Sequence, residues 1–369
     1  MTLYYQGTLV GAAKEMMEGA LDELRRPQRL FQLALLLSSL WLWSCEQAGT
    51  RSVFNGRTMG TTYEITLATE APLPMERRRE LGDEIENKLI YINKLMSTYD
   101  PESELSTFNE QPPGTCVRLA LETFEVMSQS KTLFERTSGA FDPTVGPLVE
   151  LWGFGAQAQR REVPAPEAIE ASRARVGFDA LDLNCVERGV LKRLMRAVDF
   201  SAIAKGFAVD TLSDLLSDSG YPNHLVEVGG ELRAQGRAPS GQPWRVAIER
   251  PSIAARDLYA VVPLSNLAMA TSGDYRNFFT EEGIRYSHTI DPRTGYPVTH
   301  RLASVTVLHE HAALADGWAT ALNVLGPEAG LKLARQEQLA VLMLEYDGEV
   351  FKELTTPNFD AILASIFEQ

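Results

Sequence analysis

The sequence lacks the short motifs by which several large enzyme classes are recognised. It contains no HExxH, CxxC, GxSxG or GxGxxG pattern and no P-loop. Zinc hydrolases, α/β-hydrolases, P-loop NTPases and Rossmann dehydrogenases therefore lose their usual sequence support. The chain also lacks a repeat with a period of about 20–50 residues, which argues against a solenoid.

Positive charge is scarce along the chain. Lys and Arg together number 35 against 49 Asp and Glu, which gives a formal net charge of −14. Nucleic-acid affinity depends on basic side chains that neutralise phosphates, so this balance argues against a nucleic-acid partner. In other respects the composition is that of a folded protein. Of the 369 residues, 44% are hydrophobic and 23% charged, enough for one large domain or two ordinary ones.

The largely apolar run near the N-terminus is too short for a membrane span. It extends from Leu30 to Trp43, after the basic stretch RRPQR (25–29) and before a Ser-Cys pair. As a helix, these 14 residues rise only about 21 Å, against a hydrocarbon core of about 30 Å. The pattern predicts a signal peptide over residues 1–44 that includes an over-long start, with an ordinary N-terminal membrane anchor as the alternative.

Cysteine is rare, with three residues in the whole chain. Cys45 ends the sequence LWSC, which resembles a bacterial lipobox, in which this cysteine is lipidated and becomes the first mature residue. Residues 45–56 are then the lipidated cysteine and a polar tether, and the folded domain spans 57–369. Cys116 and Cys185 form either one disulfide or two buried thiols, and the sequence does not choose between them.

The hydrophobic pattern predicts a mixture of strands and helices. The expected strands cover 61–68, 224–236 with a glycine break, 243–251 and 303–310, and the expected helices cover 75–95, 117–137 and 312–324. Residues 197–220 resemble a strand, a turn at Ser201 and a helix, whereas residues 98–109 resemble a loop. The elements do not alternate in regular βαβ steps, so we expect a mixed α+β fold rather than a doubly wound parallel sheet.

The helix expected at 312–324 carries two polar side chains among apolar ones. Asp316 and Thr320 are four residues apart, which places them on the same face, one turn from each other. A buried ionised carboxylate without a partner is costly, so Asp316 requires one. A hard cation such as Mg²⁺ is one candidate. The alternative is structural: Asp316 accepts hydrogen bonds from a neighbouring loop, and Thr320 bonds back to its own helix.

Two further segments contain candidates for chemistry. DFSAIAKG (199–206) is expected to leave free amides and a positive helix end at Ser201 or Ala202, with Lys205 able to reach a phosphate. Strand–turn–helix junctions with a lysine are also common in purely structural settings. YSHTIDPRTGYPV (286–298) holds His288 in a loop fixed by glycine and proline, either as a general base or as an ordinary loop histidine.

Eight segments form a recognisable set in one order along the chain. They are GRTMGTTYEI (56–65), MSTYDPESELSTFN (96–109), SGAFDPTVGPLVELWGFG (138–155), VDFSAIAKGFAVD (198–210), HLVEVGGELRAQG (224–236), ATSGDYRNFF (270–279), SHTIDPRTGYPV (287–298) and ADGWATALNVLG (315–326). Together they resemble the ApbE family, the FAD:protein FMN transferases. The resemblance implies a single large α+β domain, ApbE-like and T-fold-related, with mixed sheets flanked by helices. It also implies Mg²⁺-dependent transfer of the FMN half of FAD to a threonine hydroxyl of a target protein, with release of AMP.

The same resemblance implies roles for individual residues. It assigns the cation to the side chains of Asp316 and Thr320 and to the backbone carbonyl of Ala202. A threonine hydroxyl needs a base, for which we favour His288, with Asp274 of a Ser-Gly-Asp turn as the alternative. The contacts with FAD are assigned to Met59, Tyr99, Ala140, Phe141, Asp142, Asp199, Lys205 and Ile290.

The partners implied are flavin-accepting subunits of membrane redox complexes, such as the sodium-pumping NADH:quinone reductase or the Rnf complex. A lipid anchor would hold the protein on the periplasmic side of the inner membrane. Two other functions remain open. One is an FAD pyrophosphatase, in which water replaces the threonine hydroxyl and FMN is released. The other is a non-catalytic flavin-binding lipoprotein.

Overall fold

The computed structural model describes residues 49–155, 162–251, 257–273 and 277–365. The predicted signal peptide and Cys45 lie outside the described residues. The strands are β1 Thr50–Thr58, β2 Thr61–Thr69, β3 Cys116–Arg118, β4 Leu181–Leu183, β5 Gly189–Lys192, β6 His224–Val228, β7 Glu231–Gln235, β8 Trp244–Glu249, β9 Leu258–Leu264, β10 Leu267–Gly273, β11 Phe278–Glu281, β12 Ile284–Ser287, β13 Leu302–His309, β14 Ala340–Tyr346 and β15 Phe351–Thr355. The helices are α3 Met75–Met96, α4 Glu104–Glu110, α5 Leu121–Arg136, α6 Gly146–Leu151, α7 Pro166–Arg173, α8 Ala204–Asp218, α9 Ala312–Gln336 and α10 Pro357–Ala364, with a short 3₁₀ turn at Phe178–Ala180.

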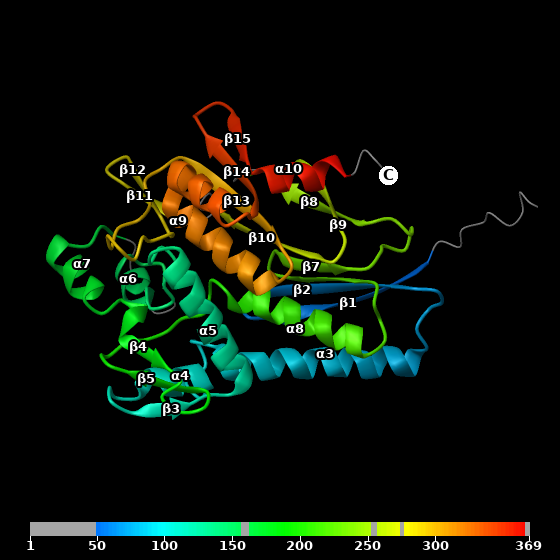
Figure 1. Ribbon diagram of the computed structural model, residues 1–369, viewed down its shortest axis with the longest axis horizontal. Helices are drawn as coiled ribbons and strands as arrows, with labels where there is room; N and C mark the ends of the chain where they lie inside the picture. The colour runs from blue at the N-terminus through cyan, green and yellow to red at the C-terminus, as the bar shows by residue number, and fades with distance from the viewer. Residues whose placement is uncertain (1–48, 156–161, 252–256, 274–276, 366–369) are drawn as a thin grey trace, which may run out of the picture. The chain divides into compact units, whose positions relative to one another are not determined.

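The largest sheet has eight strands in the order β1-β2-β6-β7-β10-β13-β14-β15 (Figure 1). Every neighbouring pair in it is antiparallel. The smaller sheets among the described residues are β3-β5-β4, β8-β9 and β11-β12, and they are antiparallel as well. A doubly wound fold is built on parallel strands joined by crossovers. The α+β prediction is therefore confirmed.

Both faces of the large sheet are covered by apolar side chains. In β14, Val341 and Met343 belong to the core shared with α3, α5, α8 and α9, whereas Leu342 and Leu344 belong to a second core with β8, β9 and α10. This two-residue period is the geometry of a strand buried on both faces. Helix α9 packs on β10 and β13, α8 packs on β6 and β7, and the two helices contact each other (Figure 1). The two helices that carry Lys205 and Asp316 thus lie side by side.

Most of the expected elements are confirmed. The predicted strands correspond to β2, β6 and β7, β8 and β13, and the predicted helices at 75–95 and 312–324 correspond to α3 and the first half of α9. Helix α9 continues to Gln336 across a kink at Gly326, whose φ of 77° leaves the helical region just before Pro327. The helix expected from residue 117 begins at Leu121, after the short strand β3. None of the described helices is long and apolar enough to cross a membrane.

The predicted polar tether was wrong over most of its length. Residues Thr50–Thr58 form β1, which pairs with β2 in an unbroken antiparallel register. Phe54 and Thr58 are buried, whereas Asn55 and Arg57 on the opposite side of the strand are exposed. Because only one face of an edge strand is buried, its sequence is polar enough to resemble a tether. The folded domain begins before the predicted boundary at residue 57.

The loop expected at 98–109 was also wrong in its second half. Glu104–Glu110 form α4, and the hydroxyl of Ser103 caps this helix by accepting from the amide of Ser106 at 2.9 Å. Phe108 of the helix is buried in the main core. A serine cluster therefore marks a helix start here rather than a turn, because the residues after it can bury an apolar face.

A disulfide closes the three-stranded sheet. Cys116 begins β3 and Cys185 lies in the turn between β4 and β5, with Cα atoms 6.2 Å apart. The bond joins residues separated by 69 positions. Restricting an unfolded loop of that length is worth about 4 kcal/mol in the chain-entropy account of disulfides. Of the two possibilities that the sequence leaves open, the structure has the disulfide.

His224 makes the stability of the fold dependent on pH. Its ring is fully buried, with Nδ1 2.7 Å from the carbonyl of Tyr221 and Nε2 2.7 Å from the hydroxyl of Ser213. A carbonyl only accepts, so Nδ1 carries the proton and Nε2 accepts from Ser213. Burial lowers the pKa of His224 below its ordinary value of 6.5. The unfolded chain therefore binds a proton first as the pH falls, and the free energy of unfolding decreases below about pH 6.5.

We expect His224→Asn to flatten this dependence. The asparagine amide can still donate to the Tyr221 carbonyl but does not titrate, so the variant is less stable at pH 7.5 yet loses less further stability by pH 5.5. Urea denaturation at the two pH values measures both quantities. Equal losses in wild type and variant would assign the acid sensitivity to other groups.

Candidate active site

A cleft of about 850 Å³ opens where the start of α8, the first half of α9, the end of β10 and two further segments meet. These segments are residues 140–155, which include α6, and the loop 288–292. All but two of the predicted site residues line this cleft. They are Tyr99, Ala140, Phe141, Asp142, Asp199, Ala202, Lys205, His288, Ile290, Asp316 and Thr320.

The two exceptions are Met59 and Asp274. Met59 lies in the turn between β1 and β2 with a φ of 49°, followed by Gly60 at 73°, as a two-residue hairpin turn of type I′ requires. It packs against the main core and is not among the lining residues. Asp274 lies outside the described residues. The two residues before it, which we expected in a turn, form the end of β10.

One ammonium group in the cleft faces two buried carboxylates. Lys205 Nζ lies 3.6 Å from Asp316 Oδ2 and 3.6 Å from Glu231 Oε1, and it donates to the carbonyl of Ser201 at 3.1 Å. Asp316 is 3% exposed and Glu231 5%. We call Lys205, Glu231 and Asp316 the carboxylate–lysine cluster.

Burial dominates the electrostatics of this cluster. Burial raises the pKa of Asp316, and Lys205 offsets this effect only in part. Burial also raises the pKa of Glu231, which Lys205 lowers and the charge of Asp316 raises further. Burial lowers the pKa of Lys205, but the two carboxylates outweigh it, so the pKa lies above its ordinary value. A second cation in the cluster would favour the ionised carboxylates.

The close approach of α8 to α9 positions Asp316. The amide of Gly206 donates to Asp316 Oδ2 at 3.4 Å. A Cβ atom at residue 206 would lie 2.2 Å from the carbonyl oxygen of Ala312, so only glycine permits this contact. Thr320 Oγ1 lies 3.2 Å from the hydroxyl of Ser272 on β10 rather than bonding to its own helix. Asp316 and Thr320 therefore keep oxygen lone pairs beyond those used in these contacts.

The oxygens predicted to hold a cation come from α9 and from the turn before α8. Within the described part of the chain, no group donates to the carbonyl of Ala202. One carboxylate, one hydroxyl and one carbonyl are hard donors that suit Mg²⁺, which takes few protein ligands and completes its shell with water and substrate phosphates. The described residues contain no cluster of three or more His, Cys, Asp or Glu that could hold a metal. The oxygens of Asp316, Thr320 and Ala202 are donors of the kind that Mg²⁺ takes.

The amides before α8 are less available than the sequence predicted. Helix α8 begins at Ala204, and no strand precedes it between residues 197 and 200. The amide of Ser201 donates to Asp199 Oδ1 at 2.8 Å, and the amides of Ile203 and Ala204 donate to a backbone carbonyl. These donors close the turn, so Lys205 is the main positive group at this end of the helix.

The start of α9 is held by a carboxylate from α8. Asp210 accepts from the amides of Ala312 and Ala313 at 2.9 and 3.0 Å, and Arg233 Nη1 lies 3.0 Å from the same carboxylate. Asp210 is 9% exposed. A carboxylate at a helix N-terminus satisfies free amides and complements the helix dipole. Asp210 thus fixes the helix that carries Asp316.

We expect Asp210→Ala to lower the free energy of unfolding by about 3–5 kcal/mol, because it removes the buried partner of Arg233, whose side chain is 12% exposed, and leaves two amides uncapped. Asp214 is the matched control. It contacts the same Arg233 atom at 3.3 Å, but its side chain is 70% exposed. Asp214→Ala should cost about 1 kcal/mol or less. Urea denaturation of both variants tests the assignment, and equal costs would contradict it.

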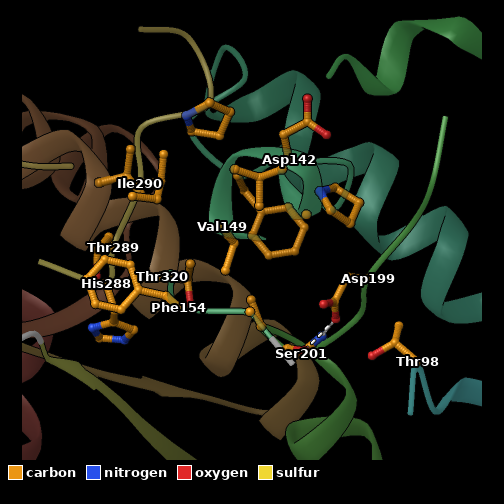
Figure 2. Close-up of a pocket in the computed structure, with 18 of the residues that line it drawn as sticks. Thr98, Asp142, Val149, Phe154, Asp199, Ser201, His288, Thr289, Ile290 and Thr320 are labelled. Atoms are coloured by element: carbon orange, nitrogen blue, oxygen red, sulfur yellow. Dashed lines mark hydrogen bonds between the residues drawn. The ribbon is translucent and has the colours of Figure 1, made fainter. Parts of the chain in front are cut away.

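Asp142 and Asp199 shape the walls of the cleft. Asp142 accepts from the amide and hydroxyl of Thr144 at 2.8 and 2.6 Å and from the amide of Phe178 at 3.2 Å. Asp199 accepts from both the amide and the hydroxyl of Ser201. Figure 2 shows Asp199 and Ser201 on the side of the cleft opposite His288. Asp142 and Asp199 therefore already accept hydrogen bonds that stabilise the neighbouring loops.

His288 is oriented by the backbone beside it. Its Nδ1 lies 3.1 Å from the carbonyl of Asn277, which also accepts from the His288 amide at 3.1 Å. The Nδ1 atom is therefore the donor, and in the neutral ring Nε2 carries the lone pair that can accept a proton. Phe154 packs edge-on against the imidazole ring, with 6.3 Å between the ring centroids. Phe154 also contacts Phe279, which in turn stacks on Tyr286. This row of aromatic rings fixes the loop that carries His288.

Sequence reasoning missed two buried polar residues of the cleft, Glu231 and Asn323. Asn323 follows Thr320 by three positions and Asp316 by seven, so helical periodicity could have found it. Its Nδ2 donates to the Thr289 hydroxyl at 3.3 Å. No local pattern distinguishes Glu231, because its proximity to Lys205 depends on how β7 packs beneath α8.

Comparison with known proteins gives consistent results. Residues 59–343 match the sequence model of the ApbE family. A Vibrio cholerae protein named FAD:protein FMN transferase is 40% identical over 334 residues, which cover 90% of this chain and 98% of that protein. The Escherichia coli K12 protein of the same name is 36% identical over 345 residues, covering 90% and 97%. The solved structure of the flavin transferase ApbE from Vibrio cholerae is similar with a TM-score of 0.78 and 40% identity, covering 85% of this chain and 100% of that one.

Proposed function

The chain belongs to the ApbE family, and on that premise we propose that it transfers the FMN half of FAD to a threonine hydroxyl of a target protein and releases AMP. The chain covers nearly the full length of relatives named FAD:protein FMN transferase. The reaction forms a bond between the hydroxyl oxygen and the FMN phosphorus and breaks the bond to the AMP phosphate. The hydroxyl proton passes to a base.

The observation that carries the proposal is that Asp316, Thr320 and Ala202 line one cleft together with Lys205, whose Nζ lies 3.6 Å from Asp316 Oδ2. The cleft volume lies within the roughly 300–1,000 Å³ of small-molecule and cofactor sites. These oxygens would hold Mg²⁺. When bound, the cation neutralises charge on the phosphoryl oxygens and on the departing AMP.

Phosphoryl transfer requires mainly positioning and charge stabilisation from the protein. Lys205 offers a point charge to the diphosphate, and Phe141 and Ile290 offer apolar contacts to the rings of FAD. We assign the base to His288, whose Nδ1 is tied to the Asn277 carbonyl, so that Nε2 accepts the hydroxyl proton.

We further propose flavin-accepting subunits of membrane redox complexes as targets, of the sodium-pumping NADH:quinone reductase or Rnf type. The site of action would be the periplasmic face of the inner membrane, with the protein anchored through a lipid on Cys45. The Cys116–Cys185 disulfide supports this location, because disulfides persist in oxidising compartments such as the periplasm.

The test is to incubate the purified protein with FAD, Mg²⁺ and a target subunit, then measure covalent flavin fluorescence on the target together with AMP. We expect equal amounts of both, and no product without the target. AMP with free FMN in the absence of target would instead indicate the pyrophosphatase. FAD binding without AMP under any divalent metal would indicate a flavin-binding protein.

A further inference from the structure

The carboxylate–lysine cluster holds two carboxyl groups within reach of one ammonium group. Lys205 Nζ is equally distant, 3.6 Å, from Asp316 and Glu231. Both distances exceed those of a close charge-assisted hydrogen bond. The ammonium is therefore shared between the two acids rather than fixed on one.

One oxygen of Glu231 is left without a hydrogen bond by the part of the chain that the structure describes. Its Oε2 is buried and, among the described residues, lacks a hydrogen-bond partner. Leaving a buried acceptor of this kind unpaired is costly, so a donor that reached Glu231 Oε2 would be stabilised there. The lysine stem is flexible and three donors sit on Nζ, which allows the ammonium to turn toward this oxygen.

A divalent cation on Asp316 and the ammonium of Lys205 repel each other. They would compete for the same carboxylate, Asp316, in a site where charges are poorly screened. Glu231 offers the ammonium a second buried carboxylate with an unsatisfied oxygen. If the ammonium moved to Glu231, Asp316 would be available to the cation, and the positive charge of Lys205 would stay in the cleft.

We propose that in the flavin-free protein the Lys205 ammonium neutralises Asp316 in place of the divalent cation. When the cation binds to Asp316, the ammonium moves to Glu231. Glu231 is thus a positioning residue: it acts on the cation site only through Lys205. The proposal rests on the proposed cation site at Asp316 and deepens it. It predicts opposite effects on cation binding for one substitution at Lys205 and one at Glu231.

The experiment is titration of the flavin-free protein with Mn²⁺, with free Mn²⁺ counted by electron paramagnetic resonance. Lys205→Met removes the competitor, so Mn²⁺ should bind tenfold or more tightly than in wild type. Glu231→Gln confines the ammonium to Asp316, so Mn²⁺ should bind tenfold or more weakly. Thermal melting of each variant with and without Mn²⁺ gives a second readout and shows that each is folded.

The double variant Lys205→Met/Glu231→Gln removes both partners of this exchange and is the matched control. If Glu231 acts only through Lys205, Glu231→Gln should have no effect once Lys205 is absent. A full effect of Glu231→Gln in that background would make Glu231 a direct contributor to the cation site and overturn the proposal. So would Lys205→Met binding Mn²⁺ no more tightly than wild type.

Asp316→Asn separates this inference from the proposed function. It should abolish Mn²⁺ binding in every background. If wild type binds no Mn²⁺ and Asp316→Asn behaves identically, the cation site itself fails. If Asp316→Asn removes binding but the Lys205 and Glu231 variants do not move it in opposite directions, only the exchange fails.

Discussion

Replacing Asp316 with alanine is expected to reduce FMN transfer by about 10³-fold or more, because a divalent cation at a phosphoryl group contributes several kcal/mol to the transition state. Asp316 is the only carboxylate among the three proposed cation ligands. The fold should survive, since Lys205 retains Glu231 as a partner. The rate of covalent flavin incorporation and a melting curve measure the two effects separately.

Glu328→Ala is the matched control for Asp316→Ala. Glu328 lies on the same helix, α9, but is exposed and outside the cleft. The substitution removes the same charge, so any long-range effect of net charge would appear in both variants. We expect the control to retain the wild-type rate. A wild-type rate in Asp316→Ala would contradict the cation assignment.

Replacing His288 with alanine is expected to lower transfer by about 10²–10⁴-fold, the usual contribution of a general base. The loss should appear in the turnover rate, with FAD binding little changed, because the ring is assigned to the target hydroxyl rather than to the flavin. Single-turnover kinetics with FAD already bound isolate this step.

His311→Ala is the control for His288→Ala. His311 is exposed at the start of α9 and does not line the cleft. Its substitution should change the rate by less than about twofold, as is usual for surface positions away from a site. A loss below tenfold in His288→Ala would assign the base to another group, with Asp274 the next candidate.

The placement of the two polar side chains on α9 could be predicted because it depends on local geometry. A helix repeats every 3.6 residues, so the spacing of Asp316 and Thr320 alone places them on one face. The structure agrees and adds that Asp316 is almost fully buried. The same rule extends to Asn323, which lies on that face as well.

Other parts of the site depend on packing that no local pattern encodes. Gly206 matters because α9 passes within contact of it, and Glu231 matters because β7 lies beneath α8. Both contacts join segments far apart in the chain. The disulfide likewise required knowledge of the fold, since Cys116 and Cys185 meet only when β3, β4 and β5 form their sheet.

The errors in secondary structure have a common physical cause. β1 and α4 each bury one narrow face and expose the rest, so their polar residues suggested a tether and a loop. The partner that buries each face, β2 for the strand and the main core for the helix, is absent from the local sequence. Long elements with wide apolar faces, such as α3 and β13, were predicted correctly because the periodicity of their apolar residues is visible in the local sequence.

The proposed function depends on a divalent cation that oxygens of α9 and of the turn before α8 bind beside the FAD diphosphate. Anomalous diffraction from crystals grown with FAD and Mn²⁺ tests it most directly. The account predicts one strong peak in coordination distance of Asp316, Thr320 and the Ala202 carbonyl. A bound flavin with no peak there, and Asp316 still paired with Lys205, would contradict it.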